Sequence, residues 1–187
     1  MQSRKIYVLI VTLLWLGPSA QAQVPPDQIA REQTTHIIDL VKANRAAYAK
    51  DYRKLYAMVD EQVLPHFDFR VMAKSVLGRH WRDATEEQRA RFIVEFRDLL
   101  VRTYATALLK YNDEQFRFLP FNTKPGDTTA VVRSEVVSGG GAPPVAIHYS
   151  FYVSDSTWKV YDVAIEGVSL VTNYRSTYSQ RIQTDGL

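Results

Sequence analysis

The spacing of hydrophobic residues changes along the chain from a helical period to an alternating one. Up to Tyr111, apolar residues recur mainly three and four positions apart, as on one face of an α-helix. From Gln115 to Ile165 they alternate with polar residues, as in half-buried β-strands. A helical spacing returns after Ser169. This order predicts helices first, then an antiparallel meander, and then a last helix.

Start and stop signals divide the predicted helical part, residues 27–111. Asp27 follows two prolines and is expected to cap the first helix, and a second helix is predicted over about 55–63. The third helix is the most clearly delimited, because Asp68 can cap its start and Gly78 can end it.

The longest predicted helix begins after Thr85 and runs to about Tyr111. Thr85 is followed three residues later by Gln88, which is the pattern of a capping box. One face of this helix is continuously apolar. Its members are Phe92, Phe96, Leu99, Leu100, Tyr104, Ala107, Leu108 and Tyr111.

Four strands and a last helix are predicted after the helical part. The strands cover residues 115–119, 129–137, 145–153 and 157–165, and the helix covers 169–182. Because helices and strands are segregated along the chain, the predicted fold class is α+β, with a curved antiparallel sheet of about four strands packed against helices. Residues 23–187 are expected to form one domain.

The first 22 residues have the pattern of a signal peptide. Arg4 and Lys5 precede an apolar run of 11 residues, Ile6–Leu16, and Ala20-Gln21-Ala22 is a small-x-small cleavage pattern. Eleven residues are too few to cross a bilayer, so cleavage is favoured over a retained anchor. The mature chain is expected to begin near Gln23 and to be exported.

Without these 22 residues the chain is nearly neutral, with 21 Lys and Arg against 20 Asp and Glu. This balance argues against nucleic acid as the main partner, because phosphate binding needs a basic face. The chain has no cysteine, which excludes disulfides, thiolate catalysis and thiolate metal sites.

Catalytic patterns are scarce. The histidines after residue 22, His36, His66, His80 and His148, have no metal-ligand spacing, and there is no GxSxG, Walker or GxGxxG pattern in a suitable context. Asp162 lies within a predicted strand, on the side of Val160 and Ala164 if the alternation is regular. A buried carboxylate there is expected to bond to nearby backbone or to arginine, and a general base is the alternative.

The aromatic residues of the long helix and the sheet permit two interpretations. Phe96 and Tyr104 would face Tyr149 and Phe151 across the interior. A solid core and the lining of a pocket for an apolar ligand have the same spacing, so the pattern does not separate them.

Two stretches resemble the MlaC, or toluene-tolerance auxiliary, family. They are FDFRVMAKSVLGRHWRDATEEQRARFIVEFRDLLVRTYATALLKY at 67–111 and WKVYDVAIEGVSLVTNYRSTY at 158–178. The phrases that carry the resemblance include Leu77-Gly78 with Trp81, Tyr161-Asp162-Val163 and Glu166-Gly167-Val168-Ser169. They occur in the family's order, and the resemblance extends over roughly residues 30–187. This chain stops at 184–187, where family members continue into another short helix, so the tail is absent or the chain is truncated.

The resemblance implies a periplasmic phospholipid shuttle without catalytic activity or cofactor, with phospholipid as cargo. Such a monomer would exchange lipid with an outer-membrane lipoprotein–porin complex and with an inner-membrane ABC transporter carrying a ring of MCE subunits, and so maintain outer-membrane lipid asymmetry. The fold implied is nuclear transport factor 2-like, with a helical subdomain closing an apolar pocket. Transport direction and lipid species stay open.

The inward faces of the third helix, the long helix and the later strands are expected to hold the acyl chains. The residues expected there are Met72, Val76, Leu77, Phe96, Leu100, Tyr104, Leu108, Val132, Ile147, Tyr149, Phe151 and Val163. Three alternatives stay open: a small isomerase or dehydratase using Asp162 or His148, a carrier of a hopanoid or quinone, and an interaction module with a solid core.

Overall fold

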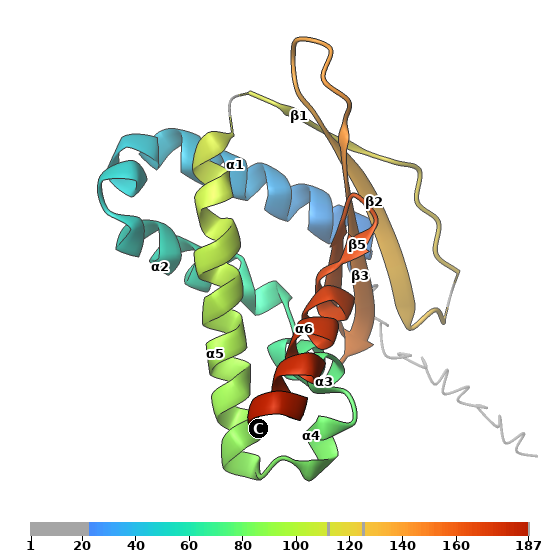
Figure 1. Cartoon of the computed structure of the whole chain (residues 1–187). Helices are drawn as coiled ribbons and strands as arrows, with labels where there is room; N and C mark the ends of the chain where they lie inside the picture. Colours follow the sequence, from blue (N-terminus) through green and yellow to red (C-terminus); the bar gives the residue numbers. More distant parts are fainter. Residues whose placement is uncertain (1–22, 112, 125, 187) are drawn as a thin grey trace, which may run out of the picture.

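The computed structural model describes residues 23–111, 113–124 and 126–186 (Figure 1). The predicted signal peptide, residues 1–22, lies outside the described residues. Among the helices of the described part, none combines the length and the hydrophobicity that a membrane span requires.

The chain forms helices first, then a sheet, then a last helix, so the predicted α+β class is confirmed. The helical part comprises α1 (Pro26–Lys50), α2 (Tyr52–Gln62), the 3₁₀ turn η1 (Leu64–His66), α3 (Phe69–Leu77), α4 (His80–Asp83), α5 (Glu86–Tyr104) and the 3₁₀ turn η2 (Ala105–Lys110). The strands are β1 (Gln115–Phe118), β2 (Thr129–Val137), β3 (Val145–Ser154), β4 (Thr157–Ile165) and β5 (Val168–Ser169), and α6 (Leu170–Asp185) follows.

The strands form one antiparallel sheet in the order β1-β2-β3-β4-β5. In Figure 1 the sheet lies to the right of α2 and α5, the start of α1 reaches the sheet, and α6 lies beside α3. The sequence predicted about four strands, and the described residues contain five. The additional strand, β5, has only two residues and pairs with the end of β4.

Two of the predicted helix starts are confirmed by their hydrogen bonds. The carboxylate of Asp68 accepts from the backbone N–H of Val71 at 2.9 Å. At the start of α5, Thr85 Oγ1 accepts from the N–H of Gln88 at 3.2 Å, and Gln88 Oε1 accepts from the N–H of Thr85 at 2.8 Å. Gly78 ends α3 with a φ of 55°, a value that glycine adopts without a steric penalty.

The prediction that Asp27 caps α1 is wrong. Pro25 is the N-cap, and it makes no side-chain capping bond. Pro26 occupies the first helical position, where its missing N–H costs nothing, and its fixed φ suits the helix. Asp27 therefore lies inside the first turn, where it forms an ion pair with Arg31 at 3.9 Å.

The prediction of one long helix to Tyr111 also needs correction. α5 ends at Tyr104 and continues as the 3₁₀ turn η2 to Lys110, so α1, with 25 residues, is longer than α5, with 19. The short helix α4 was not predicted. α6 extends to Asp185, beyond the predicted end at 182.

A β-bulge interrupts the alternation of β4. Ser150 pairs with Asp162, whereas Phe151 pairs with Val160, so Tyr161 is the extra residue. Because of this extra residue, Val160 and Val163 both belong to the same apolar cluster. The expectation that Asp162 shares a side with Val160 is therefore wrong.

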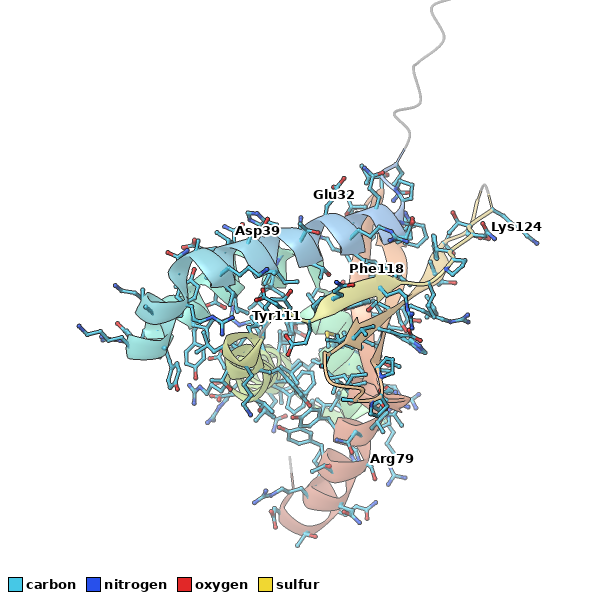
Figure 2. All side chains as sticks on the ribbon, turned by 90° about the horizontal axis from the view of Figure 1, so that it is seen from above. Glu32, Asp39, Arg79, Tyr111, Phe118 and Lys124 are labelled. Atoms are coloured by element: carbon cyan, nitrogen blue, oxygen red, sulfur yellow. The ribbon has the colours of Figure 1, made fainter. Side chains whose placement is uncertain are left out.

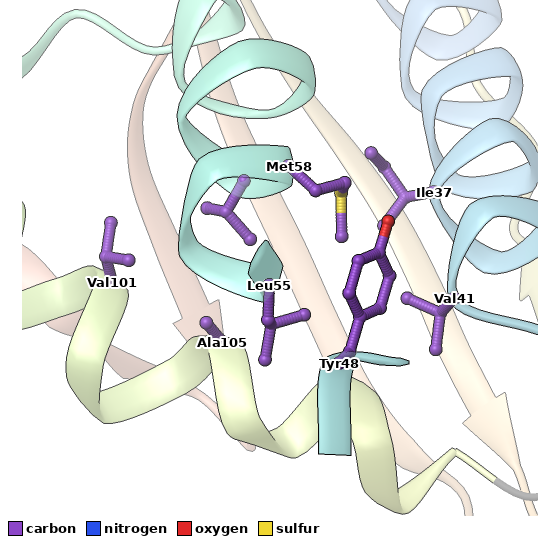
Figure 3. Packing of buried hydrophobic residues seen from close by; sticks show 8 residues of the cluster. Ile37, Val41, Tyr48, Leu55, Met58, Val101 and Ala105 are labelled. Carbon is purple, nitrogen blue, oxygen red and sulfur yellow. The ribbon is translucent and has the colours of Figure 1, made fainter. Parts of the chain in front are cut away.

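Three clusters of buried apolar residues surround the interior. One joins α1, α2 and the end of α5, where Tyr48, Leu55 and Met58 pack together (Figure 3). The second joins α3, α5 and α6 around Phe96, which is fully buried. The third covers the inner face of the sheet around Phe151. Residues of all three clusters line a cavity in the interior.

Candidate functional site

A cavity of about 340 Å³ lies between the helical part and the inner face of the sheet. Its volume falls at the lower end of the range of small-molecule sites, about 300–1,000 Å³. The lining includes the polar side chains of Gln33, Thr34, Gln62 and His66 and the hydroxyl-bearing rings of Tyr104 and Tyr149, and the other lining residues are apolar. Within the described part of the chain, no Asp, Glu, Lys or Arg lines this cavity.

The sheet side of the cavity comes mainly from β3 and β4, and Phe116 of β1 adds to it. Ile147, Tyr149 and Phe151 project from β3 at the spacing of two that places side chains on one face. On β4 the lining residues are Val160, Val163 and Ile165, of which the first two are three apart and the last two are two apart. The bulge at Tyr161 makes this possible, because the extra residue restores both valines to the same face.

The helical side of the cavity uses the four-residue period of α5 and its continuation. Leu100, Tyr104 and Leu108 line the cavity along one row. The guanidinium of Arg45 on α1 donates to the carbonyl oxygens of Leu109, at 3.2 Å, and of Tyr111. These bonds tie the end of the 3₁₀ turn η2 to α1 and satisfy carbonyls that have no helical partner.

On the sheet side, Tyr149 brings a polar group to the wall of the cavity. The hydroxyl of Tyr149 is hydrogen-bonded with Ser134 on β2 and Thr34 on α1. Ser134 is fully buried and also donates to the carbonyl oxygen of Ile147 at 3.2 Å. Burial raises the pKa of Tyr149 despite these hydrogen bonds, which act in the opposite direction. Tyr149 is therefore neutral at neutral pH.

His66 is the histidine among the described residues that line the cavity. Burial lowers its pKa, and the positive charge of Lys159 lowers it further. The Lys159 ammonium donates to the carbonyl oxygen of Pro65, next to His66, at 2.6 Å. At pH 7 the imidazole is thus neutral, and the described lining carries no charge. Such a cavity favours an uncharged, apolar ligand segment.

Eight of the twelve predicted site residues line the cavity: Met72, Leu100, Tyr104, Leu108, Ile147, Tyr149, Phe151 and Val163. The other four, Val76, Leu77, Phe96 and Val132, are almost completely buried in the packed clusters and are not among the lining residues. That any of the twelve residues contacts a ligand remains a prediction. For these last four residues, the cavity does not support that prediction.

The sequence reasoning missed the contribution of the first two helices. Ile29, Ala30, Ile37 and Ile38 line the cavity from α1, and Val59 and Val63 line it from α2 and its C-terminal end. The apolar stripe of α1 was visible in the sequence, with Ile29 and Ile37 on it. Its spacing alone could not show that the stripe faces a cavity.

The two residues considered for catalysis lie outside the cavity lining. Asp162 accepts a hydrogen bond from Ser169 Oγ at 2.5 Å and another from the N–H of Val171 at 3.1 Å, so it anchors the start of α6. His148 lies in β3 opposite Arg133 and Ala164. Within the described residues, no three or more His, Cys, Asp or Glu side chains gather as they would around a metal ion.

Fold and cavity together define a class: an α+β protein whose helices and sheet enclose an apolar cavity. Residues 31–187 match the family model described as MlaC protein. The chain belongs to the MlaC family, which confirms the resemblance found in the sequence.

Two relatives and one solved structure are similar over most of this chain. The intermembrane phospholipid transport system binding protein MlaC of Haemophilus influenzae is 23% identical, over 89% of this chain and 78% of that protein. Toluene tolerance protein ttg2D of Pseudomonas putida is 26% identical, over 98% of this chain and 83% of that protein. The phospholipid-binding protein from Ralstonia solanacearum, solved in complex with a phospholipid, is 30% identical, with a TM-score of 0.77, over 84% of this chain and 87% of that one.

Proposed function

We propose that this protein is a phospholipid-binding transport protein that holds acyl chains in the cavity between its helices and its sheet. The observation that carries the proposal is the cavity itself, whose described lining has no charged side chain. Membership of the MlaC family and the phospholipid bound by the similar Ralstonia solanacearum protein support phospholipid as the ligand.

We further propose that the chain acts in the periplasm as a monomer, without cofactor, and moves phospholipid between the outer and inner membranes. Its partners would be an outer-membrane lipoprotein–porin complex and an inner-membrane ABC transporter with a ring of MCE subunits. This exchange would maintain outer-membrane lipid asymmetry. The signal-peptide pattern of residues 1–22 supports the location.

The energetics of acyl-chain burial fit a protein that releases its lipid again better than one that retains it. Burying one methylene is worth about 0.8 kcal/mol, so one 16-carbon chain gains roughly 12 kcal/mol on leaving water. A phospholipid does not come from water, however, but from a membrane that is already apolar. The free energy of moving a phospholipid between membrane and cavity is therefore close to zero. Docking to partners would set the direction of the transfer.

Native mass spectrometry of the chain from Gln23 onward, purified without detergent, tests the proposal directly. We expect a discrete mass increment that organic extraction identifies as one or two phospholipids. A hopanoid or quinone in the extract would replace phospholipid as the cargo. A folded protein that stays bare after incubation with liposomes would refute the carrier function.

The enzyme alternative has less support, because Asp162 and His148 lie outside the cavity lining. Asp162 is engaged at the start of α6, through Ser169 and the N–H of Val171. Replacing it with Asn should therefore lower stability and leave lipid loading of the folded protein unchanged. Loss of a measurable turnover without loss of stability would revive the enzyme alternative.

A further inference from the structure

His66 brings an imidazole to the wall of a cavity that has no Asp, Glu, Lys or Arg among its described lining residues. It ends the 3₁₀ turn η1, which joins α2 to α3, and it is half-buried. Charged side chains elsewhere lie on the outside. In Figure 2 the labelled examples at the periphery, all of them exposed, are Glu32, Asp39, Arg79 and Lys124. A proton taken up by His66 would therefore place a charge at the wall of the interior.

The charge that acts on His66 is positive. Lys159 on β4 lowers the pKa of His66, in addition to the larger effect of burial. Its ammonium donates to the carbonyl oxygen of Pro65 at 2.6 Å, which holds the charge beside η1. An imidazolium at His66 would thus face a like charge.

The acids of the neighbouring elements are not placed to compensate an imidazolium. On α2, which packs against η1, Asp60 and Glu61 are exposed, so solvent screens their charges. At the start of α3, the carboxylate of Asp68 is already engaged, because it caps the helix and accepts from the hydroxyl of Tyr152.

The other ionisable groups of the described lining are phenols. They belong to Tyr104 and Tyr149, and burial raises the pKa of both above 10.0. Both phenols are therefore neutral throughout the pH range in which His66 takes up a proton. A change in lipid binding below neutral pH would then report on the imidazole and not on these rings.

An acyl chain in the cavity changes the surroundings of the imidazole. In the empty protein, water in the cavity can hydrate an imidazolium, whereas an acyl chain displaces this water and presents hydrocarbon instead. Because loss of water disfavours the charged form, the pKa of His66 should be lower in the loaded protein than in the empty one. Binding couplings are reciprocal, so protonation must weaken lipid binding by the same factor.

We propose that His66 makes lipid binding sensitive to protons, so that the cavity retains acyl chains at neutral pH and releases them in mildly acidic surroundings. The inference rests on the proposed function, because the acyl chain is what removes water from the imidazole. Affinity is complete above the pKa of the empty protein, which lies below the ordinary 6.5 of histidine. It declines as the pH falls through that value.

The pH dependence of lipid loading tests the inference. The chain from Gln23 onward is incubated with vesicles of phosphatidylethanolamine and phosphatidylglycerol at pH 7.5 and pH 5.0, and its bound lipid is counted by mass spectrometry. The phosphates and the amine of these lipids keep their charges over this range, so the titrating group belongs to the protein. We expect the partition of lipid from vesicles to protein to fall about threefold or more at pH 5.0, and by at most about tenfold per pH unit, as for one proton.

Three substitutions assign the effect. His66→Gln should abolish the pH dependence, since glutamine is polar but does not titrate. His148→Gln is the matched control, because it replaces the same residue type on β3, outside the cavity lining, and it should keep the full dependence. Lys159→Gln removes the positive charge beside η1, so the affinity should begin to fall at a higher pH than in the unmodified protein.

NMR titration of the His66 imidazole, with and without lipid, gives a second readout that needs no substitution. Its pKa should be lower in the loaded protein. Equal pKa values in the two states, equal loading at both pH values, or a pH dependence that His66→Gln retains would overturn the inference and leave the proposed function intact. Absence of bound phospholipid at pH 7.5 would instead refute the proposed function.

Discussion

The substitution Val163→Thr tests whether Val163 forms the wall of a cavity or part of a packed core. Val163 lines the cavity from β4 and has 9% of its surface exposed. Threonine has nearly the same shape as valine but replaces a methyl group with a hydroxyl. In the lipid-free protein this hydroxyl faces the cavity, where a water molecule can bond to it. With an acyl chain in the cavity, it would face hydrocarbon.

The expected cost therefore falls on the loaded state. A buried hydroxyl without a partner costs about 1–3 kcal/mol in proteins. Since 1.4 kcal/mol corresponds to a factor of ten, Val163→Thr should lower lipid affinity about 5- to 150-fold. The stability of the lipid-free protein should change by less than about 1 kcal/mol.

Val132→Thr is the matched control on the same sheet. Val132 belongs to the same apolar cluster as Val163, but it is only 1% exposed and does not line the cavity. Its hydroxyl would lack a partner in both states, so we expect the stability to fall by about 1–3 kcal/mol. The lipid affinity of the folded protein should stay unchanged.

Two measurements on each variant decide the outcome. Chemical denaturation of the delipidated protein gives the free energy of unfolding, and exchange of a fluorescent phospholipid with vesicles gives the relative affinity. A Val163→Thr protein that loses stability but keeps its affinity, or equal losses of affinity in both variants, would refute the placement of Val163 against the acyl chain. Equal losses of affinity would also mean that Val132 contacts lipid, as the sequence alone suggested.

Three further predictions follow from single contacts. Ser169→Ala removes both the cap of α6 and the hydrogen-bond donor to Asp162. The free energy of unfolding, measured by thermal unfolding, should therefore fall by about 1–2 kcal/mol. An unchanged melting temperature would contradict the capping role. Because burial raises the pKa of Tyr149 above its ordinary 10.0, the phenol ionises first in the unfolded chain. The contribution of the neutral phenol to the free energy of unfolding is complete below pH 10 and declines at higher pH by about 1.4 kcal/mol per pH unit. Tyr149→Phe should flatten this decline when the free energy of unfolding is measured by denaturation between pH 9 and 11. A parallel decline in both proteins would contradict the prediction. Gly167 has a φ of 78° in the two-residue turn between β4 and β5. Because alanine is disfavoured at this φ, Gly167→Ala should lower the free energy of unfolding, measured with urea, by about 1 kcal/mol. An unchanged free energy of unfolding would mean that the turn relaxes.

Most of the secondary structure could be predicted from local chemistry. Asp68 and Gly78 bound α3 because a carboxylate satisfies the N–H of Val71 and glycine accepts a positive φ. The capping box at Thr85 started α5 for a similarly local reason. The prediction that Asp27 caps α1 was wrong, because Pro26 suits the first helical position and the helix therefore starts one residue before Asp27.

The cavity needed information that local patterns do not carry. Val132 and Val163 both look like inward strand residues, yet only Val163 lines the cavity. Spacing defines which face a side chain takes, but the distance to the opposite element decides whether that face meets a neighbour or an open space. The bulge at Tyr161 adds to this, because it shifts Val163 and Asp162 to sides that regular alternation would not give them.

The sequence by itself determined the α+β class, the order of helices and strands, most helix limits and the resemblance to the MlaC family. Only the tertiary structure decided which apolar faces leave a space between them, because a cavity is a property of how α1, α5 and the sheet are held apart. It also placed α1 beside β1, although the two are far apart in the sequence, so that Thr34, Ile38 and Phe116 together line the cavity. Periodicity records the face of each element, and packing between distant elements turns those faces into a site.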